Sequence, residues 1–399
     1  MCLTTGRLAS VTDALSKVQY FSYNDRGEQT RTWGDTTYPV EYVYDDYGQK
    51  TEMHTFRGGT GWTGSTWPAS PGTADVTKWT YEAATGLLTS KTHGHGSAVA
   101  DTIGYTYTPE GRLKTRTWAR LAGGNPLVTT YSYDANTGEM TGIDYSDSTP
   151  DVTYTYNRLG RHETITDAAG TRTFTYRSSD LQLETEDIDG SSGGLYSRLI
   201  TRKYETAGTG TLAGRPAGFM IGDSSDPDAD YDLTYAYDAA GRLEKISGTG
   251  LPAGGVKYAR LANSELIEKI EYLDGSASPL LSATRSFEAD RDLVTKIKNY
   301  DHVNSQTISQ YLYRNDALGR RTDVVYTGTA FAQDHLFKWR YNDRSELTAA
   351  DRHQGTDPDS PGTRYGTHGA FDYAYDPIGN RESYQLDGGT ATTYTTNNL

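Results

Sequence analysis

The stretch LTYAYDAAGRLEKISG, residues Leu233–Gly248, contains the pattern that decides the fold. Tyr235 and Tyr237 are two residues apart, so on a β-strand their rings project from the same face. Asp238 follows and opens a turn by accepting hydrogen bonds from its own backbone. Gly241 supplies the positive φ that a tight hairpin needs. The stretch therefore predicts a strand, a turn and a second strand.

Internal repeats determine the architecture of a chain, and this pattern recurs along the whole sequence. When each copy is aligned on its second aromatic residue, which we call the anchor, there are fourteen copies. A glycine follows ten anchors within four to six residues, and the other copies offer Asp180, Asn263, Asp292 and Ser345 there. Asp and Asn tolerate positive φ better than other residues that carry a side chain. The anchors are Tyr23, Tyr44, Tyr81, Tyr107, Tyr133, Tyr156, Tyr176, Tyr204, Tyr237, Tyr258, Phe287, Tyr313, Tyr341 and Tyr375.

The second strand of each unit is less regular than the first. Leu243 and Ile246 are three residues apart, which breaks the alternation of a strand. Either a β-bulge after the glycine returns both side chains to one face, or they project from opposite faces. The segment ANSELIEKIEYL, Ala262–Leu273, has helical propensity, but its alignment with AAGRLEKISG predicts a strand.

The composition suits a strip of hairpins better than a conventional globule. Only 35% of the 399 residues are hydrophobic and the mean hydropathy is −0.70, yet 12% are aromatic and 32 are tyrosine. A sheet that is wetted on both faces and held by ladders of tyrosine accounts for these values. We therefore expect an all-β fold in which residues 1–399 form one continuous array of tandem β-hairpin repeats.

Charge, hydropathy and cysteine usage exclude several classes of function. The net charge is −14 and no basic stripe occurs, so nucleic acid is not an expected partner. No apolar run is long enough to span a membrane. Cys2 is the only cysteine, which excludes internal disulfides. Residues 5–13 resemble the back half of a repeat and residues 394–399 the start of another, so we expect a fragment of a longer chain.

Three longer stretches between anchors are predicted to be surface loops because they are rich in Gly, Ser, Thr, Pro or Asp. They are residues 56–76, 205–232 and 354–369. Loops on a rigid scaffold often carry binding residues. The first loop contains Trp62 and Trp67, which are therefore the candidate ligand-contact residues.

One acidic loop has part of a calcium-binding motif. Asp226, Asp228 and Asp230 have the spacing of the first half of a calcium loop. Tyr231 and Tyr237 stand where the turn glycine and the closing glutamate of such a loop belong. A solvated acidic loop is the simpler interpretation, and calcium binding stays the alternative.

Two further motifs have the letters of chemical sites without their partners. His93 and His95 lie on one strand face, but a closed zinc site needs four ligands and no others follow. GSSGG, residues 190–194, matches a nucleophile elbow in letters but lies in a Gly/Ser loop with no helix after it. We therefore predict no catalytic residue, no metal site, no cofactor and no enzyme activity.

The residues expected to build the repeats come from the best copies of the pattern. The arginine that follows the turn glycine could pair with an aspartate of an adjacent turn, and such exposed pairs contribute less than about 1 kcal/mol each. Arg112, Arg161, Arg242 and Arg320 are the arginines concerned. The repeat-structural residues are Tyr107, Gly111, Arg112, Tyr156, Gly160, Arg161, Tyr235, Tyr237, Asp238, Gly241, Arg242, Tyr375, Asp376 and Gly379.

The copies YDAAGRLEKI, YNRLGRHETI, YTPEGRLKTR, YDPIGNRESY and YDDYGQKTEM resemble the YD repeats of the Rhs family. That family includes bacterial polymorphic toxins, the C component of insecticidal toxin complexes and the animal teneurins. The resemblance implies a β-sheet strip that spirals into part of a hollow shell. In toxin members the shell encloses a C-terminal toxin domain, and in teneurins it supports cell–cell adhesion.

The resemblance also implies partners and a location. We expect a non-catalytic shell segment of a large secreted or cell-surface protein, whose partners are its own further repeats, core segment and C-terminal cargo domain. The alternative is an adhesion or carbohydrate-binding scaffold that contacts glycans or cell-surface proteins. Asp376-Pro377-Ile378-Gly379 has the letters of the element near which toxin members cleave themselves, but it occupies an ordinary repeat turn. No cleavage role is assigned to Asp376.

Overall fold

The computed structural model describes residues 6–97, 100–189, 197–208, 212–223, 230–366 and 369–395. Within these ranges the chain forms thirty strands of one sheet and no helix. The prediction of an all-β chain built from hairpins is confirmed. The strands are β1 (Ser10–Thr12), β2 (Val18–Tyr23), β3 (Gln29–Gly34), β4 (Val40–Tyr44), β5 (Lys50–Phe56), β6 (Ala74–Tyr81), β7 (Leu88–His93), β8 (Asp101–Tyr107), β9 (Leu113–Ala122), β10 (Asn125–Tyr133), β11 (Met140–Tyr145), β12 (Val152–Tyr156), β13 (His162–Asp167), β14 (Gly170–Tyr176), β15 (Leu183–Asp189), β16 (Arg198–Tyr204), β17 (Pro216–Gly222), β18 (Tyr231–Tyr237), β19 (Leu243–Gly248), β20 (Gly255–Arg260), β21 (Ile267–Leu273), β22 (Pro279–Phe287), β23 (Val294–Asp301), β24 (Gln306–Asn315), β25 (Arg321–Thr327), β26 (His335–Tyr341), β27 (Leu347–Gln354), β28 (Ala370–Tyr375), β29 (Arg381–Leu386) and β30 (Thr392–Thr393).

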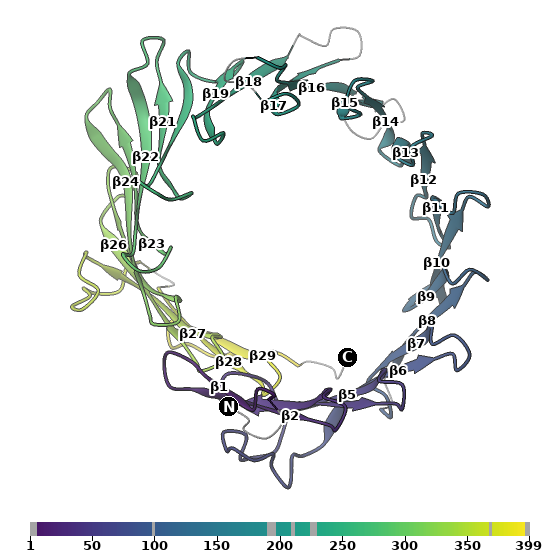
Figure 1. Cartoon of the computed structure of the whole chain (residues 1–399). Coiled ribbons are helices and arrows are strands. Elements are labelled where there is room, and N and C mark those ends of the chain that lie inside the picture. The colour runs from purple at the N-terminus through teal and green to yellow at the C-terminus, as the bar shows by residue number, and fades with distance from the viewer. Residues whose placement is uncertain are drawn as a thin grey trace. The chain divides into compact units, whose positions relative to one another are not determined.

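Strands that follow each other in the sequence pair with each other in antiparallel fashion. In β18 and β19, Tyr235 lies opposite Ile246 and Tyr237 lies opposite Leu243. Figure 1 shows this order along β9 to β21, where each strand lies beside the next. The segment predicted to be a strand in spite of its helical propensity forms β21, which confirms the alignment of the repeats.

A β-bulge after each turn settles the irregular spacing in the second strand. The register shifts between Ala236 and Tyr237, because Lys245 lies opposite Ala236 and Leu243 opposite Tyr237. Glu244 is therefore an extra residue, and Leu243 and Ile246 both lie opposite tyrosines on one face. The same shift occurs at the end of the first strand in most other hairpins, including β2–β3, β12–β13 and β28–β29.

One predicted loop contains a strand. Residues 205–232 were expected to form a surface loop, but β17 occupies Pro216–Gly222 within them and pairs with both β16 and β18. Phe219 and Ile221 are two residues apart, so their side chains project from the same face of a strand. Phe219 makes an edge contact with Tyr235, with ring centroids 6.4 Å apart. The loop prediction was therefore wrong for these residues.

The chain divides into two compact units. Unit 1 comprises Met1–Gly104, Ser286–Lys298 and Thr307–Leu399, and unit 2 comprises Tyr105–Arg285 and Asn299–Gln306. Among the described residues of unit 2, Val256 and Leu273 are the only buried hydrophobic side chains. Most of its side chains are half-buried, as expected for a sheet wetted on both faces.

Unit 1 has a denser core around β25 and β26. Leu336 and Val324 are almost fully buried there. Next to them the His335 ring stacks between Tyr326 and Tyr365, with centroid distances of 4.7 and 4.8 Å. Burial lowers the pKa of His335, so the ring packs here as a neutral aromatic group. The described residues contain no helix with the length and apolar character of a membrane span.

Candidate functional site: contacts between successive repeats and a hollow at Trp79

The turn of each repeat is fixed by the aspartate or asparagine that follows the anchor. Asp238 Oδ1 accepts from the backbone N–H groups of Ala240 and Arg242, both at 2.9 Å. This is the turn that the sequence predicted. These backbone bonds, above all the one from Arg242, hold the pKa of Asp238 below its usual value. The same turn occurs at Asp45, Asn157, Asp316 and Asp376.

The turn residues with positive φ agree with the sequence in most copies. Gly111, Gly160, Gly241 and Gly379 have φ between 71° and 92°. Of the four copies without glycine, Asn263 and Ser345 have φ of 58° and 64°. The expectation of positive φ was wrong at the other two positions, Asp180 and Asp292. In the turn that contains Asp180, φ is positive at Leu181 instead, because that turn is one residue longer. Asp292 is not among the described residues with positive φ.

The structure corrects the anchor in two repeats. The strands extend two residues beyond Tyr258 and Tyr313, so that Arg260 and Asn315 are the last residues before their turns. The alignment on aromatic residues missed this, because Tyr258 and Tyr313 occupy the position of Tyr235 and not that of Tyr237. Four of the predicted repeat-structural residues are anchors that end their strands as expected: Tyr107 ends β8, Tyr156 ends β12, Tyr237 ends β18 and Tyr375 ends β28.

In nine repeats the anchor hydroxyl connects the repeat to the one before it. Tyr237 Oη donates to Pro216 O at 2.6 Å, and Pro216 is the first residue of the preceding return strand. Arg260, which replaces tyrosine at the anchor, makes the same contact to Leu243 O through Nη1 at 2.8 Å. The sequence did not reveal this bond, although the recurrence of tyrosine at the anchor was its signal. The other pairs are Tyr44–Gln29, Tyr81–Lys50, Tyr133–Leu113, Tyr156–Met140, Tyr176–His162, Tyr204–Leu183, Tyr341–Arg321 and Tyr375–Leu347.

The arginine after the turn glycine reaches forward to the next repeat. Arg242 Nε donates to Asp238 Oδ2 of its own turn at 2.9 Å, and its Nη1 donates to Ser264 O of the next turn at 3.3 Å. The same Nη1 pairs with Glu265 Oε1 of the next turn at 3.2 Å, so the pairing expected with an aspartate of an adjacent turn is made here with a glutamate. In five repeats the Cζ of the arginine after the turn glycine lies 4.0–5.9 Å from the centroid of the next anchor ring: Arg7–Tyr23, Arg112–Tyr133, Arg161–Tyr176, Arg215–Tyr237 and Arg320–Tyr341. In a sixth repeat Arg177, which directly follows its anchor Tyr176, lies 4.9 Å from the centroid of the Tyr204 ring.

The turn glycine has a second role besides its positive φ. A Cβ atom at Gly138 would overlap the guanidinium of Arg112, which comes from the preceding repeat. A Cβ at Gly86 would lie 3.1 Å from the amide nitrogen of Gln49. The glycine therefore also leaves room for the side chain that arrives from the preceding turn.

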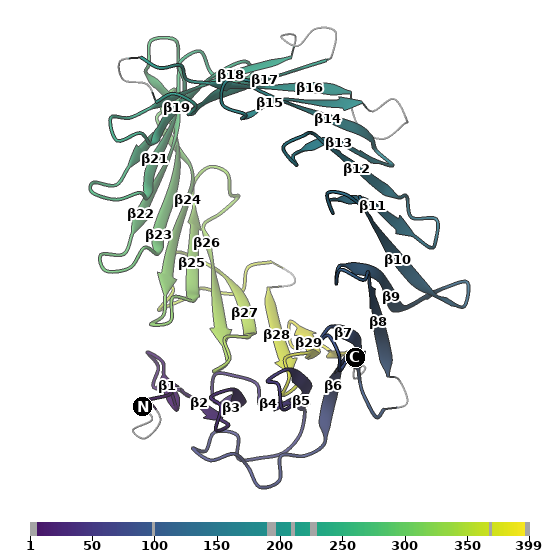
Figure 2. The same cartoon turned by 45° about the vertical axis from the view of Figure 1, so that its right-hand side comes forward.

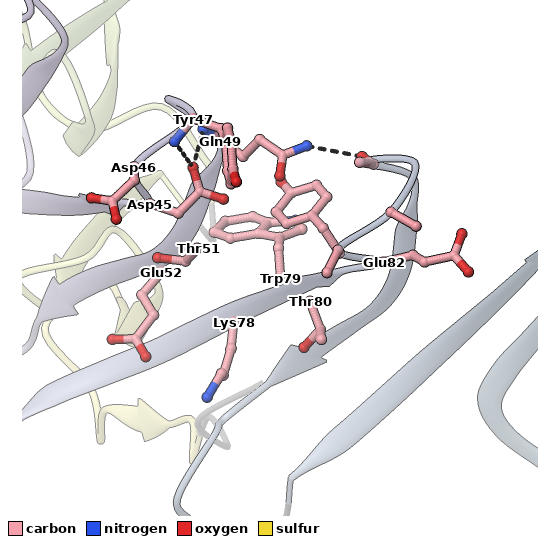
Figure 3. A pocket seen from close by; sticks show the side chains of 14 residues that line it. Asp45, Asp46, Tyr47, Gln49, Thr51, Glu52, Lys78, Trp79, Thr80 and Glu82 are labelled. Carbon is pink, nitrogen blue, oxygen red and sulfur yellow. Dashed lines mark hydrogen bonds between the residues drawn. The ribbon is translucent and has the colours of Figure 1, made fainter.

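A hollow of about 860 Å³ lies between the turn after β4 and the turn after β6. Figure 3 shows the indole of Trp79 in its centre and the side chains of Asp45 and Gln49 above it. Asp45 Oδ1 accepts from the backbone N–H groups of Tyr47 and Gln49, both at 2.9 Å. Gln49 Nε2 donates to Gly86 O at 2.9 Å, which bridges the two turns.

The lining of this hollow is aromatic and acidic. Burial and the nearby Asp45 carboxylate raise the pKa of Tyr81, whose ring also lines the hollow. Asp46, Glu52 and Glu82 add three more carboxylates to the lining, whereas Lys78 adds one ammonium group. The hollow therefore favours a ligand with an apolar body and a positive charge.

Trp62 and Trp67 lie in a cluster of aromatic rings over β3 and β5. Their ring centroids are 5.1 Å apart. Trp67 packs against Trp33, and Trp62 packs against Phe56, each with ring centroids 5.5 Å apart. The rings of Trp33 and Phe56 are buried. Arg31 lies 4.9 Å above Trp67. Both candidate ligand-contact residues are thus half-buried packing residues that keep one part of the ring at the surface.

The first and last parts of unit 1 meet through side chains, at contacts that we call the terminal interface. In both views the turn after β28 lies against β5 (Figures 1 and 2). Burial and the bond to Glu346 raise the pKa of Tyr38 to about 12. A Cβ at Gly379 would overlap the Tyr38 hydroxyl. The pairs are Lys17 Nζ–Asp343 Oδ2 at 2.9 Å, Tyr38 Oη–Glu346 Oε1 at 2.5 Å and Arg57 Nη1–Asp376 Oδ2 at 3.6 Å.

Among the described residues, no group of three or more His, Cys, Asp or Glu could hold a metal ion. Burial lowers the pKa of His93 at the end of β7. Asp226 and Asp228 of the acidic loop and residues 190–194 lie outside the described residues.

Comparisons with known proteins agree with the fold. No family model and no curated protein matches the sequence. A chain in the crystal structure of TcdB2-TccC3-TEV is similar, with 14% identity and a TM-score of 0.56 over 96% of this chain. The chain spans 22% of the length of that protein. A chain in the Photorhabdus luminescens Tc holotoxin pore matches with 14% identity and a TM-score of 0.41, over 96% of this chain and 22% of that one. The first similarity confirms, at the level of the fold, the resemblance drawn from the repeats.

Proposed function

We propose that this chain is a non-catalytic shell segment of a larger Rhs-type protein, which encloses or presents a C-terminal toxin domain. The observation that carries the proposal is the similarity of fold to the TcdB2-TccC3-TEV chain over 96% of the residues. The contacts between repeats support it, because recurring positions such as Tyr237 and Arg242 bind the neighbouring hairpins. The partners are then the protein's own further repeats, core segment and cargo domain, and the location is secreted or cell-surface.

Protection of the cargo from protease tests this proposal. The full-length protein, with whatever follows Leu399 in its gene, is treated with a nonspecific protease and followed by mass spectrometry. We expect the C-terminal domain to stay intact under conditions that digest the same domain expressed alone. Cleavage of that domain at equal rates in both forms would contradict enclosure, and a full-length protein without such a domain would contradict the toxin role.

A scaffold that binds carbohydrate is the second candidate. The pair of Trp62 and Trp67 favours it, because half-exposed indoles offer the flat apolar faces on which sugar rings stack. The test is a glycan array probed with the chain and with a Trp62→Ala variant. Binding that is lost in the variant supports the scaffold, and an array that stays blank at high protein concentration rejects it.

A further inference from the structure

A guanidinium occupies a defined place in the repeats that have the full Asp–Gly–Arg turn. Arg320 Nε donates to Asp316 Oδ2 at 2.6 Å, and its Cζ lies 4.9 Å from the centroid of the Tyr341 ring. Its Nη1 donates to Asn342 O of the next turn at 3.0 Å. Three groups thus hold the cation: the second oxygen of the turn carboxylate, the face of the next anchor, and a backbone carbonyl. Arg242 makes the first and third of these contacts in its own repeat.

The hollow at Trp79 offers the first two groups to solvent. Gln49 follows the turn glycine Gly48, which is the position that Arg320 occupies after Gly319. The Gln49 side-chain amide donates to Gly86 O but carries no charge. Asp45 Oδ1 is engaged by the turn, whereas Asp45 Oδ2 has no hydrogen-bond partner among the described residues. Within that same part of the chain, no cation lies over the Tyr81 ring. A carboxylate oxygen and an aromatic face that elsewhere bind a guanidinium therefore both border the hollow.

Other repeats without an arginine fill this place with their own side chains. At the anchors Tyr23 and Tyr133 the residue after the turn glycine is a glutamate, and its carboxylate lies against the glycine of the next turn. In the hollow at Trp79 the corresponding side chain leaves about 860 Å³ open. That volume is in the range of small-ligand sites, so it accommodates a whole side chain with its flanking backbone.

We propose that the hollow at Trp79 binds an arginine side chain that is presented by a second polypeptide segment. The guanidinium pairs with Asp45 Oδ2 and lies over Tyr81, as Arg320 does with Asp316 and Tyr341. Arginine suits the place better than lysine because its planar group both stacks on a ring and donates to a carboxylate. The carboxylates of Asp46 and Glu82 attract the cation at longer range. The inference rests on the repeat geometry and is independent of the proposed shell role.

The test is a titration of the chain with the peptide acetyl-Gly-Arg-Leu-amide, and the matched peptide carries citrulline instead of arginine. Citrulline keeps the shape of the side chain but removes its charge. Binding is followed by the NMR signal of the Trp79 indole N–H, which is identified by its loss in Trp79→Phe. We expect the signal to shift with the arginine peptide, and the citrulline peptide to bind at least about fivefold more weakly. Equal binding of the two peptides, or no shift with either, would overturn the proposal.

Two variants locate the binding. Asp45→Asn keeps the turn, because Asn157 makes the same turn in another repeat, and removes the negative charge. We expect it to bind the arginine peptide about tenfold more weakly while its circular dichroism spectrum stays unchanged. Gln49→Arg supplies the chain's own guanidinium, so it is expected to abolish peptide binding and to raise the unfolding temperature. Peptide binding by Gln49→Arg at the original affinity would contradict the assignment.

The chain provides a control for the second variant. Gln182 Nε2 donates to Gly214 O at 2.9 Å, which is the same contact that Gln49 makes to Gly86. The next anchor, Tyr204, already carries Arg177 at 4.9 Å. Gln182→Arg is therefore expected to leave both peptide binding and the unfolding temperature as they are. If a neutral oligosaccharide shifts the Trp79 signal and the arginine peptide does not, the ligand of the hollow is a sugar. That result would overturn the proposal.

Discussion

Successive hairpins and the terminal interface hold the chain by different means. In β18 and β19, backbone groups pair at five register positions, and the anchor Tyr237 adds a hydroxyl bond to the preceding hairpin. At the terminal interface the two parts of unit 1 meet through side chains, such as Tyr38 and Glu346, which are 308 residues apart. Backbone ladders do not titrate and are insensitive to salt, whereas side-chain pairs depend on protonation and on the small size of a residue such as Gly379. The ladder therefore sets the fold, and the terminal interface is the contact that conditions can alter.

The largest effect is expected from a change that breaks the ladder itself. Gly248 has a φ of 134° and lies opposite Leu233, and a Cβ there would overlap the backbone oxygen of Asp232. Because a backbone atom cannot move aside without shifting the strand, Gly248→Ala should lower the free energy of unfolding by about 3 kcal/mol. Gly250→Ala is the control, since its φ is 78° and its nearest atom would be 3.5 Å away. Urea unfolding that gives equal losses for the two would contradict the prediction.

The next effect compares the same turn position in the two regions. Gly379 and Gly241 have φ of 92° and 80°, so alanine is strained by a similar amount in both, at a cost of about 1 kcal/mol. Gly379→Ala must in addition displace the Tyr38 ring from the terminal interface, and we expect a loss of about 2 kcal/mol in total. The excess should disappear in a Tyr38→Ala background. If the excess persists there, the cost of Gly379→Ala does not come from the terminal interface.

The terminal interface should weaken at alkaline pH. The Tyr38 hydroxyl donates to the Glu346 carboxylate, and the pKa of Tyr38 is raised from 10.0 to about 12. A raised pKa means that folding favours the neutral hydroxyl, so its contribution is complete below about pH 10 and is lost between about pH 10 and about pH 12. Tyr38→Phe should therefore cost about 1.5 kcal/mol at neutral pH and less at each step toward pH 12. A difference in unfolding free energy that stays constant with pH would exclude this mechanism.

The smallest effect is expected from one anchor hydroxyl. Tyr237→Phe removes the bond to Pro216 O and keeps the ring, which should cost about 1 kcal/mol. Tyr235→Phe is the matched control, because the Tyr235 hydroxyl has no hydrogen-bond partner among the described residues. The two variants are compared by thermal unfolding at neutral pH. A loss of equal size in both would mean that the anchor bond adds nothing to the ladder.

The local part of this fold could be predicted from the sequence because it depends on chemistry within a few residues. Asp238 and Gly241 determine a turn whatever lies around them, and aromatic alternation determines the strand before it. Alignment failed at Tyr258 and Tyr313 because aromatic residues also occupy the position two before the anchor. The turn aspartate Asp316 was the better reference, since it marks the turn directly.

The contacts between repeats could be predicted only in part. A hydroxyl bond such as Tyr237 to Pro216 joins residues 21 positions apart, and its acceptor is a backbone carbonyl that any residue can supply. The pair of Tyr38 and Glu346 follows no repeat at all. The hollow at Trp79 had a signal in the sequence, because Gln49 replaces the arginine of the pattern. That substitution gains meaning only when the other repeats show where the arginine lies.

The two contacts between repeats also govern how such a chain can change its length during evolution. Many hairpins bind backward through the anchor hydroxyl and forward through the residue after the turn glycine, as Tyr237 and Arg242 do, and the acceptors of these two bonds are backbone carbonyls. Removal or duplication of a complete hairpin rejoins the same donor and acceptor positions, whatever the side chains of the new neighbour. Removal of a single strand would reverse the direction of every later strand relative to the earlier ones, and the donor and acceptor positions at the new junction would no longer meet. Gene rearrangements in units of whole hairpins therefore preserve the sheet, and an array of this kind grows or shrinks two strands at a time.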